Sequence, residues 1–399
     1  MVICIRLRHR ISYYIASHTL HGRLLMEERG VKILQWIMLL FTFIGIFLGY
    51  LYIDQFSNDV NLFLVLYVTF LAFFIGLYLH VILHEIGHLI CGLRTGYRFV
   101  ALCILNVTIV KNNGKLKIKR YRIPGAGGGC MLSPPDMKNG TYPIKLYISG
   151  GLLMNFLIVI VCFGAFYYLA ETADLWARAF LIIGLVGTLL GVLNLVPSNI
   201  SLPSDGYILF TAGKKENDSM LRGFWSCLNI QKMDVEDVRP REIPVELFNW
   251  VENDSSNVYA IETAYRRYRY ILDKQELDQA GEMLRSLYNN LQNISDIQKE
   301  SFHCDLLFHE MIEGCRQEEI DRLYTKQLQK YMKFTRTEIS TQRVLYAYAR
   351  LVLKDTTKTK EHLDLFNKAC TRSIWSGGMH CERDMIALID KIADERGIV

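Results

Sequence analysis

The chain has 399 residues, of which 51% are hydrophobic and 21% are charged, and its formal net charge is +5. This composition fits a membrane protein with a soluble appendage. The ten cysteines contain no CxxC pair, which excludes the common cysteine-based zinc modules, and no disulfides are expected. Because the excess of lysine and arginine flanks apolar segments, it gives no separate support for nucleic-acid binding.

The first half of the chain contains a basic segment followed by long apolar windows. We expect residues 1–30 to form a basic cytoplasmic segment and residues 31–213 to form a membrane domain. Crossing about 30 Å of hydrocarbon takes about 20 helical residues. Windows of sufficient length predict four spans, the second unusually long, at residues 32–53, 60–93, 146–170 and 176–197.

The distribution of lysine and arginine predicts the orientation, because short cytoplasmic loops retain these residues. The loop between the second and third windows carries ten of them against a single acid, Asp136. The other two connections between windows are acidic, with Asp54 and Asp59 in one and Glu171 and Asp174 in the other. We therefore expect the basic loop and both termini to be cytoplasmic.

The second window contains the motif His84-Glu85-Ile86-Gly87-His88. Residues four apart share a helix face, so both histidines can reach one metal ion while Glu85 projects toward a bound water. A chance match is the alternative, but ionisable groups are costly in an apolar helix and are usually functional there. The motif predicts hydrolytic chemistry on one Zn²⁺ per chain. His80, one turn earlier, is expected to line a cavity, or alternatively to support the metal ligands from behind.

A catalytic zinc holds three protein ligands and keeps a fourth position for water, so a third ligand is needed. Asp205 is the best candidate, because it follows the fourth window on the cytoplasmic side, within Pro203-Ser204-Asp205-Gly206. The alternative is that Asp205 only caps the next helix, a role that Ser204 fills equally well. Asp136, in the basic loop, is the second candidate for the ligand.

The basic loop also predicts a β-hairpin over residues 98–123, with Asn113-Gly114 as a two-residue turn between an apolar arm and an alternating one. An exposed strand edge would hold an unwound substrate as an added strand. The alternative is a positively charged loop resting on anionic lipid. The following run from Gly125 to Gly129 lacks the Lys-Ser/Thr of a phosphate-binding loop.

These motifs resemble the site-2 proteases, intramembrane zinc metalloproteases, over roughly residues 60–212. The resemblance rests on three motifs in the expected order: His84 to His88, the glycines before Asn155, and the set Asn194, Pro197, Asp205 and Gly206. It implies a core of three helices in which His84, His88 and Asp205 bind zinc. It further implies that Glu85 is the general base and that Asn155 and Asn194 contact the substrate or the oxyanion. Leu152 stands where the family has proline, and the interval from Asn194 to Asp205 is longer than usual.

From about residue 214 the chain becomes polar and helical. Helix starts near Asn257, Ile297 and Glu338 are separated by roughly 40 residues, which suggests stacked helical hairpins of the tetratricopeptide kind. An irregular helical bundle is the alternative. We expect residues 214–399 to form a cytoplasmic accessory domain that binds substrate, a partner protein or a second copy.

The whole chain is therefore expected to be mainly α-helical: a polytopic membrane core with a cytoplasmic hairpin, followed by a soluble helical domain. We expect an intramembrane zinc metalloprotease of the bacterial plasma membrane that cleaves membrane-embedded or membrane-tethered proteins or peptides. The alternative is a catalytically silent membrane scaffold that binds partners through its helical tail. A zinc transporter is less favoured, because the chain lacks internal duplication.

Overall fold

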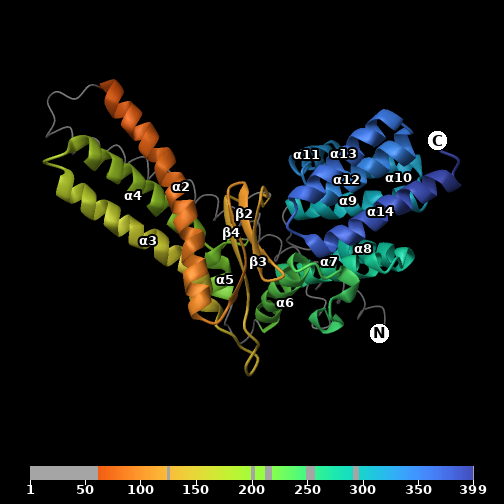
Figure 1. Ribbon diagram of the computed structural model, residues 1–399, viewed down its shortest axis with the longest axis horizontal. Coiled ribbons are helices and arrows are strands. Elements are labelled where there is room, and N and C mark those ends of the chain that lie inside the picture. The colour runs from red at the N-terminus through yellow and green to blue at the C-terminus, as the bar shows by residue number, and fades with distance from the viewer. Residues whose placement is uncertain are drawn as a thin grey trace, which may run out of the picture. The chain divides into compact units, whose positions relative to one another are not determined.

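A computed structural model describes residues 62–123, 126–198, 203–211, 218–248, 257–290 and 296–398. The described chain is mainly helical with one small antiparallel sheet, as the sequence predicts (Figure 1). The described residues divide into two compact units, one with residues 62–80, 152–198 and 203–207 and the other with residues 81–151 and those from 208 onward. The expected basic segment 1–30 and the expected first span, 32–53, lie outside the described residues.

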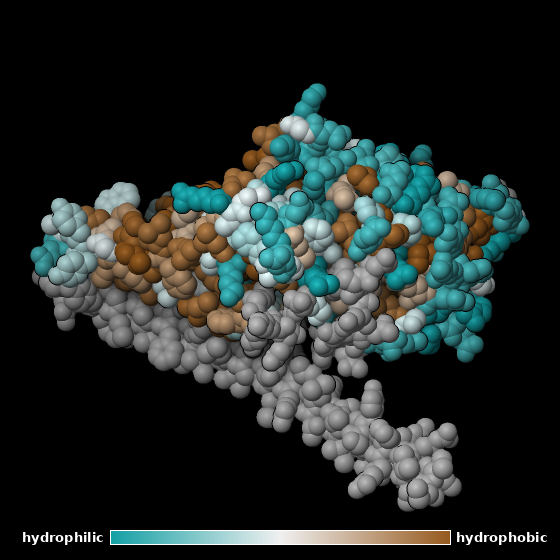
Figure 2. Space-filling model, turned by 90° about the horizontal axis from the view of Figure 1, so that it is seen from below, coloured by the Kyte–Doolittle hydropathy of each residue, from teal (hydrophilic) through white to brown (hydrophobic). Residues whose placement is uncertain are grey.

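Three described helices are long and apolar enough to cross a membrane. They are α2 (Leu62–Arg94), α3 (Ile144–Leu169) and α4 (Asp174–Leu195). These helices confirm three of the four predicted windows, with ends within about two residues of the expected ones. Hydrophobic side chains cover much of their surface in the view of Figure 2, as expected for helices that face lipid.

Small residues bring the apolar helices of the first unit close together. A Cβ added to Gly76 of α2 would lie 3.1 Å from the Ile183 backbone of α4. Beside this contact, Ala72, Ile182 and Val186 form a buried cluster. Close backbone approach at small residues is the usual basis of helix association in membranes, where lipid removes the hydrophobic drive between helices.

The second unit contains a four-stranded antiparallel sheet in the order β3-β2-β1-β4. Its strands are β1 (Arg98–Ile104), β2 (Val107–Asn112), β3 (Lys115–Lys119) and β4 (Gly128–Ser133). Asn113 and Gly114 join β2 to β3 with φ of 49° and 78°, which confirms the predicted two-residue turn. A single hairpin over 98–123 is too simple, because the chain also turns at Leu105 and β4 adds to β1.

The tail of the second unit is helical throughout its described length. Asn257, at the predicted first helix start, caps α7 by accepting hydrogen bonds from the backbone N–H groups of Tyr259 and Ala260. The other two predicted starts also lie within one residue of real helices. The helices are α6 (Asp218–Val235), α7 (Val258–Asp273), α8 (Leu277–Asn290), α9 (Asp296–Ile312), α10 (Gln317–Leu323), α11 (Lys326–Phe334), α12 (Ile339–Ala347), α13 (Thr356–Arg372) and α14 (Ser376–Glu395), with short turns η2 (Pro240–Glu242), η3 (Val245–Leu247) and η4 (Tyr348–Leu353). Tetratricopeptide character stays a prediction.

The sheet and the tail of the second unit are joined by hydrogen bonds and by an apolar cluster. Asn112 Nδ2 donates to the Val235 carbonyl at 2.7 Å, and Trp375 Nε1 donates to the Tyr121 hydroxyl at 2.9 Å. Lys119 Nζ, on β3, also donates to the Ser373 carbonyl. Buried side chains fill the junction between these bonds: Val100, Ala101, Val110, Tyr121, Val235 and Ile374. The tail therefore holds the sheet through α6 and through the segment that leads into α14.

Candidate metal centre

His84 and His88 lie one helical turn apart on α2, and both are buried. Their Nε2 atoms approach to 3.0 Å, so both rings direct a nitrogen toward the same point. Two zinc–nitrogen bonds of about 2.0–2.1 Å at a tetrahedral angle would place the nitrogens about 3.3 Å apart. The donor arrangement therefore fits a divalent metal ion with little movement of the rings.

The orientation of His88 is set by the backbone of α3. His88 Nδ1 lies 3.0 Å from the Tyr147 carbonyl oxygen and donates a hydrogen to it. That bond fixes the tautomer in which Nε2 carries the lone pair, the form that binds metals. The Tyr147 hydroxyl in turn donates to the Cys130 carbonyl of β4 at 2.8 Å, so one residue connects the histidine to the sheet.

Two glycines in α3 provide the space that the histidines occupy. A Cβ on Gly151 would lie 2.5 Å from both His84 Cε1 and His88 Nε2, closer than real side chains come. A Cβ on Gly150 would lie 2.4 Å from the Gly87 carbonyl oxygen. Any larger residue at either position would push α3 away from the histidine-bearing face of α2.

Glu85 is buried beside strand β4. A Cβ on Gly128 of β4 would lie 2.8 Å from Oε1 of Glu85, so the glycine lets the strand backbone come next to the carboxylate. Burial raises the pKa of the neighbouring Cys130 thiol, and the Glu85 charge raises it further. The thiol therefore stays neutral, so it places no negative charge beside the Glu85 carboxylate.

Asp205 joins the two histidines as a possible metal ligand. One ligand atom from each of His84, His88 and Asp205 lies within 4.8 Å of the others, so the group could hold a metal ion. Asp205 begins the short helix α5 (Asp205–Thr211). Ser204 caps that helix by accepting from Tyr207 N–H at 3.2 Å, so the cap does not require the Asp205 carboxylate. Asp136, the other predicted candidate, is exposed and outside this group.

The other residues singled out in the sequence, His80, Asn155 and Asn194, are not members of the possible metal-binding group. His80 is fully buried, with Nδ1 at 3.3 Å from Oδ1 of Asn155, and it is not part of the metal group. A Cβ on Gly187 of α4 would overlap the His80 ring at 2.1 Å, so this glycine makes room for the pair. Asn194 brings its backbone carbonyl against Gly206, where an added Cβ would lie 3.1 Å away.

Comparison of the chain with protein-family models, curated proteins and solved structures gives no match. The resemblance to the site-2 proteases therefore rests on the sequence motifs alone.

Tyr147 and Gly128 are the neighbours of the site that the sequence does not indicate. Nothing in the sequence around Tyr147 marks its carbonyl as a hydrogen-bond acceptor for a histidine 59 residues away. Gly128 belongs to the glycine run, whose composition points to a loop rather than to a strand. Both residues are identified only by their contacts in the folded chain, Gly128 with Glu85 and Tyr147 with His88.

Proposed function

We propose that this chain is an intramembrane zinc metalloprotease that hydrolyses peptide bonds of membrane-embedded or membrane-tethered substrates. The observation that carries the proposal is the convergence of His84 and His88 Nε2, 3.0 Å apart, beside Glu85 on an apolar helix long enough to span a membrane. Polar groups of this kind are costly in such a helix unless they perform a function.

His84, His88 and Asp205 would hold the zinc ion, because two imidazoles and one carboxylate form a common donor set of catalytic zinc sites. When bound, the zinc would lower the pKa of water toward neutrality and polarise the carbonyl of the scissile peptide bond. The Tyr147 carbonyl would keep His88 in its ligating tautomer, and Gly151 would keep both rings in place.

Glu85 would act as the general base and then as the general acid. Its carboxylate accepts the proton of the attacking water and passes it to the departing amine, so the residue ends the cycle ionised as it began. Strand β4, the last strand of the sheet on this side, presents its backbone next to Glu85 at Gly128. An unwound segment of substrate paired with that strand would have its peptide groups exposed for attack.

The position of the motif along α2 is compatible with access for water. His84 follows Leu62 by 22 residues, which is about 33 Å along a helix. This length is close to the roughly 30 Å thickness of the hydrocarbon core. If α2 enters the membrane near Leu62, the motif lies close to the opposite edge, which the positive loop after Arg94 assigns to the cytoplasm.

Zinc content tests the proposal without knowledge of the substrate. We expect about one zinc per chain in the purified, detergent-solubilised protein. Asp205→Ala and the double variant His84→Ala, His88→Ala should lose most of it. Glu85→Gln is the matched control, because it removes the base but no ligand and should keep the metal. Absence of zinc in the unaltered protein, or unchanged zinc in the double variant, would contradict the proposal.

A further inference from the structure

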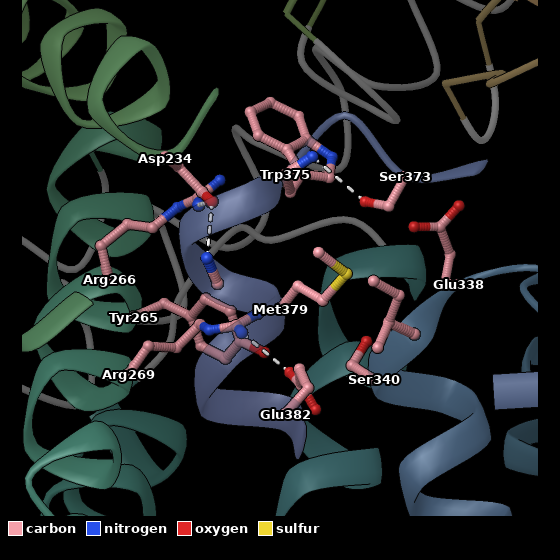
Figure 3. A pocket seen from close by; sticks show the side chains of 12 residues that line it. Asp234, Tyr265, Arg266, Arg269, Glu338, Ser340, Ser373, Trp375, Met379 and Glu382 are labelled. Atoms are coloured by element: carbon pink, nitrogen blue, oxygen red, sulfur yellow. Dashed lines mark hydrogen bonds and ion pairs between the residues drawn. The ribbon is translucent and has the colours of Figure 1, made fainter. Parts of the chain in front are cut away.

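The helical tail contains a cavity of about 140 Å³. Its walls come from α6, α7, the beginning of α12 and the N-terminal part of α14, all within the second compact unit (Figure 3). An apolar cavity of about 150 Å³ accommodates a benzene molecule, so this one admits a small organic group but not a nucleotide. Its chemistry differs from that of a simple packing defect, because most of its lining side chains are polar or charged.

The two cations that line the cavity are already paired with acids. Arg266 contacts Asp234 at 3.4 Å and Glu262 at 2.8 Å. Arg269 contacts Glu382 at 2.8 Å, an ion pair drawn as a dashed line in Figure 3. Because both guanidinium groups have acidic partners, a bound anion would have to compete with carboxylates that are already in place.

Among the described residues, Glu338 is the acid of the cavity that lacks such a partner. In the part of the chain that the structure describes, no cation contacts the Glu338 carboxylate within ion-pair distance, and it does not cap its own helix α12. In Figure 3 Glu338 stands apart from Arg266 and Arg269. Burial raises the pKa of Glu338 to about 7, because it disfavours the ionised carboxylate. A cation placed beside the carboxylate would favour the ionised form again.

Aromatic rings complete the surroundings of Glu338. Trp375 and Tyr265 line the same cavity, and the Arg266 guanidinium already lies 5.8 Å from the centre of the Trp375 ring. Aromatic faces attract ammonium and guanidinium groups, most strongly where water is excluded. Ser340 is a further polar residue of the lining and offers a hydrogen-bond acceptor at the start of α12.

We propose that this cavity binds a single cationic group, a protonated amine or a guanidinium, with Glu338 as its counter-ion and Trp375 as an aromatic wall. The source of the group is either a free small amine or the lysine or arginine side chain of a peptide. This site is separate from the metal centre and does not depend on the proposed protease activity.

The cavity is connected to the sheet through Trp375. The indole N–H of Trp375 donates to Tyr121, and the Ser373 carbonyl at the rim accepts from Lys119 of β3. Burial raises the pKa of the Tyr121 phenol, and the charge of Glu338 raises it further. Trp375 and Ser373 therefore connect the rim of the cavity to Tyr121 and to strand β3.

Binding can be measured on the full-length, detergent-solubilised protein with three small probes. Nα-acetyl-lysine amide carries the ammonium group, Nα-acetyl-norleucine amide lacks it, and n-butylamine carries it without a peptide backbone. We expect saturable binding of the lysine probe by calorimetry, together with a change in tryptophan fluorescence that is absent from Trp375→Phe. The norleucine probe should bind at least tenfold more weakly. Butylamine binding as tightly as the lysine probe indicates a free amine as the source, and preference for the lysine probe indicates a peptide.

Glu338→Gln tests the counter-ion and should weaken the lysine probe at least tenfold. Glu318→Gln is the matched control, because it makes the same change at an exposed position on α10 and should leave binding unchanged. Equal binding of the lysine and norleucine probes to the unaltered chain would overturn the proposal, and this comparison does not depend on the folding of any variant. Unchanged binding in a folded Glu338→Gln protein would overturn it as well.

Discussion

Buried histidines occur both in α2 and in the helical tail, but their ring nitrogens meet different groups. In the tail, His309 is fully buried, with Nδ1 at 3.0 Å from Glu313 Oε1 and Nε2 at 3.2 Å from the Tyr268 hydroxyl. In α2, the Nε2 atom of His84 lies 3.0 Å from the Nε2 atom of His88. At most one of these two nitrogens can carry a hydrogen that points at the other. Burial alone therefore does not distinguish these histidines, whereas the approach of two Nε2 atoms to 3.0 Å is found in α2 and suits a shared metal ion.

The carboxylates show the same contrast. In the tail, Asp305 and Glu382 are buried against Arg343, with Arg343 Nε at 3.0 Å from Glu382. Arg269 of α7 also pairs with Glu382 at 2.8 Å, so the network has two cations for two acids and stabilises the packing of α7, α9, α12 and α14. At the candidate metal centre, a carboxylate oxygen of Asp205 lies within 4.8 Å of ring nitrogens of His84 and His88, and the three could hold a metal cation.

Replacement of Gly151 by alanine should have the largest effect, because the added Cβ would occupy the position of the His84 and His88 rings. We expect metal affinity to fall on the order of 10–100-fold or more, as for changes behind other metal ligands. Gly164→Ala is the matched control on the same helix, since an added Cβ there meets nothing within 4 Å. Equal zinc binding by the two variants, measured by competition with a chelator, would show that the glycine does not shape the site.

Arg343→Met should destabilise the tail without affecting the metal. The change leaves Asp305 buried without its cation and leaves Arg269 as the remaining partner of Glu382, and breaking such a buried ion pair typically costs about 3–5 kcal/mol. Arg322→Met removes an exposed ion pair with Glu319 and should cost about 0–1 kcal/mol. Urea unfolding followed by tryptophan fluorescence measures both. A loss of zinc in folded Arg343→Met protein would contradict the expectation that this ion-pair network does not influence metal binding.

Glu338→Gln should change the pH dependence of stability by a smaller amount. Burial raises the pKa of Glu338 in the folded protein from 4.5 to about 7, so its ionisation opposes folding. The opposition is absent below pH 4.5, grows as the pH rises toward 7, and is complete above it. We expect Glu338→Gln to be more stable than the unaltered protein by about 1–3 kcal/mol at pH 8, and equally stable at pH 4.5. Thermal unfolding at both pH values measures this, and an equal difference at both would refute the assignment.

The sequence predicts those features that depend on local pattern. Apolar length is sufficient to find α2, α3 and α4, because lipid solvation acts on each helix separately. The Asn113-Gly114 turn follows from the positive φ values that these two residues tolerate. The Ser204-Asp205 pair is ambiguous in sequence, and the folded chain resolves the cap because Ser204 Oγ accepts from Tyr207 N–H.

Features that depend on contacts between distant segments are not predictable in this way. Strand β4 begins with two glycines, which have poor strand propensity, and it forms because it pairs with β1. Glycine is needed at Gly128 because Glu85 leaves no room there for a side chain. The cavity in the tail is formed by residues from Asp234 to Glu382, which no single window contains. Glu338 is recognisable in sequence as a helix start, but the lack of a cation beside its carboxylate, within the described part of the chain, is a property of the packed domain.

Gly128 leaves strand β4 without a side chain where it passes the Glu85 carboxylate. A peptide lying against this part of the strand would meet only main-chain donors and acceptors, and every amino acid except proline carries both. Preference for particular residues at the cleavage point would then have to come from the ease with which a segment unwinds, or from recognition at a distance. Such an enzyme would select its targets by their conformation more than by their sequence.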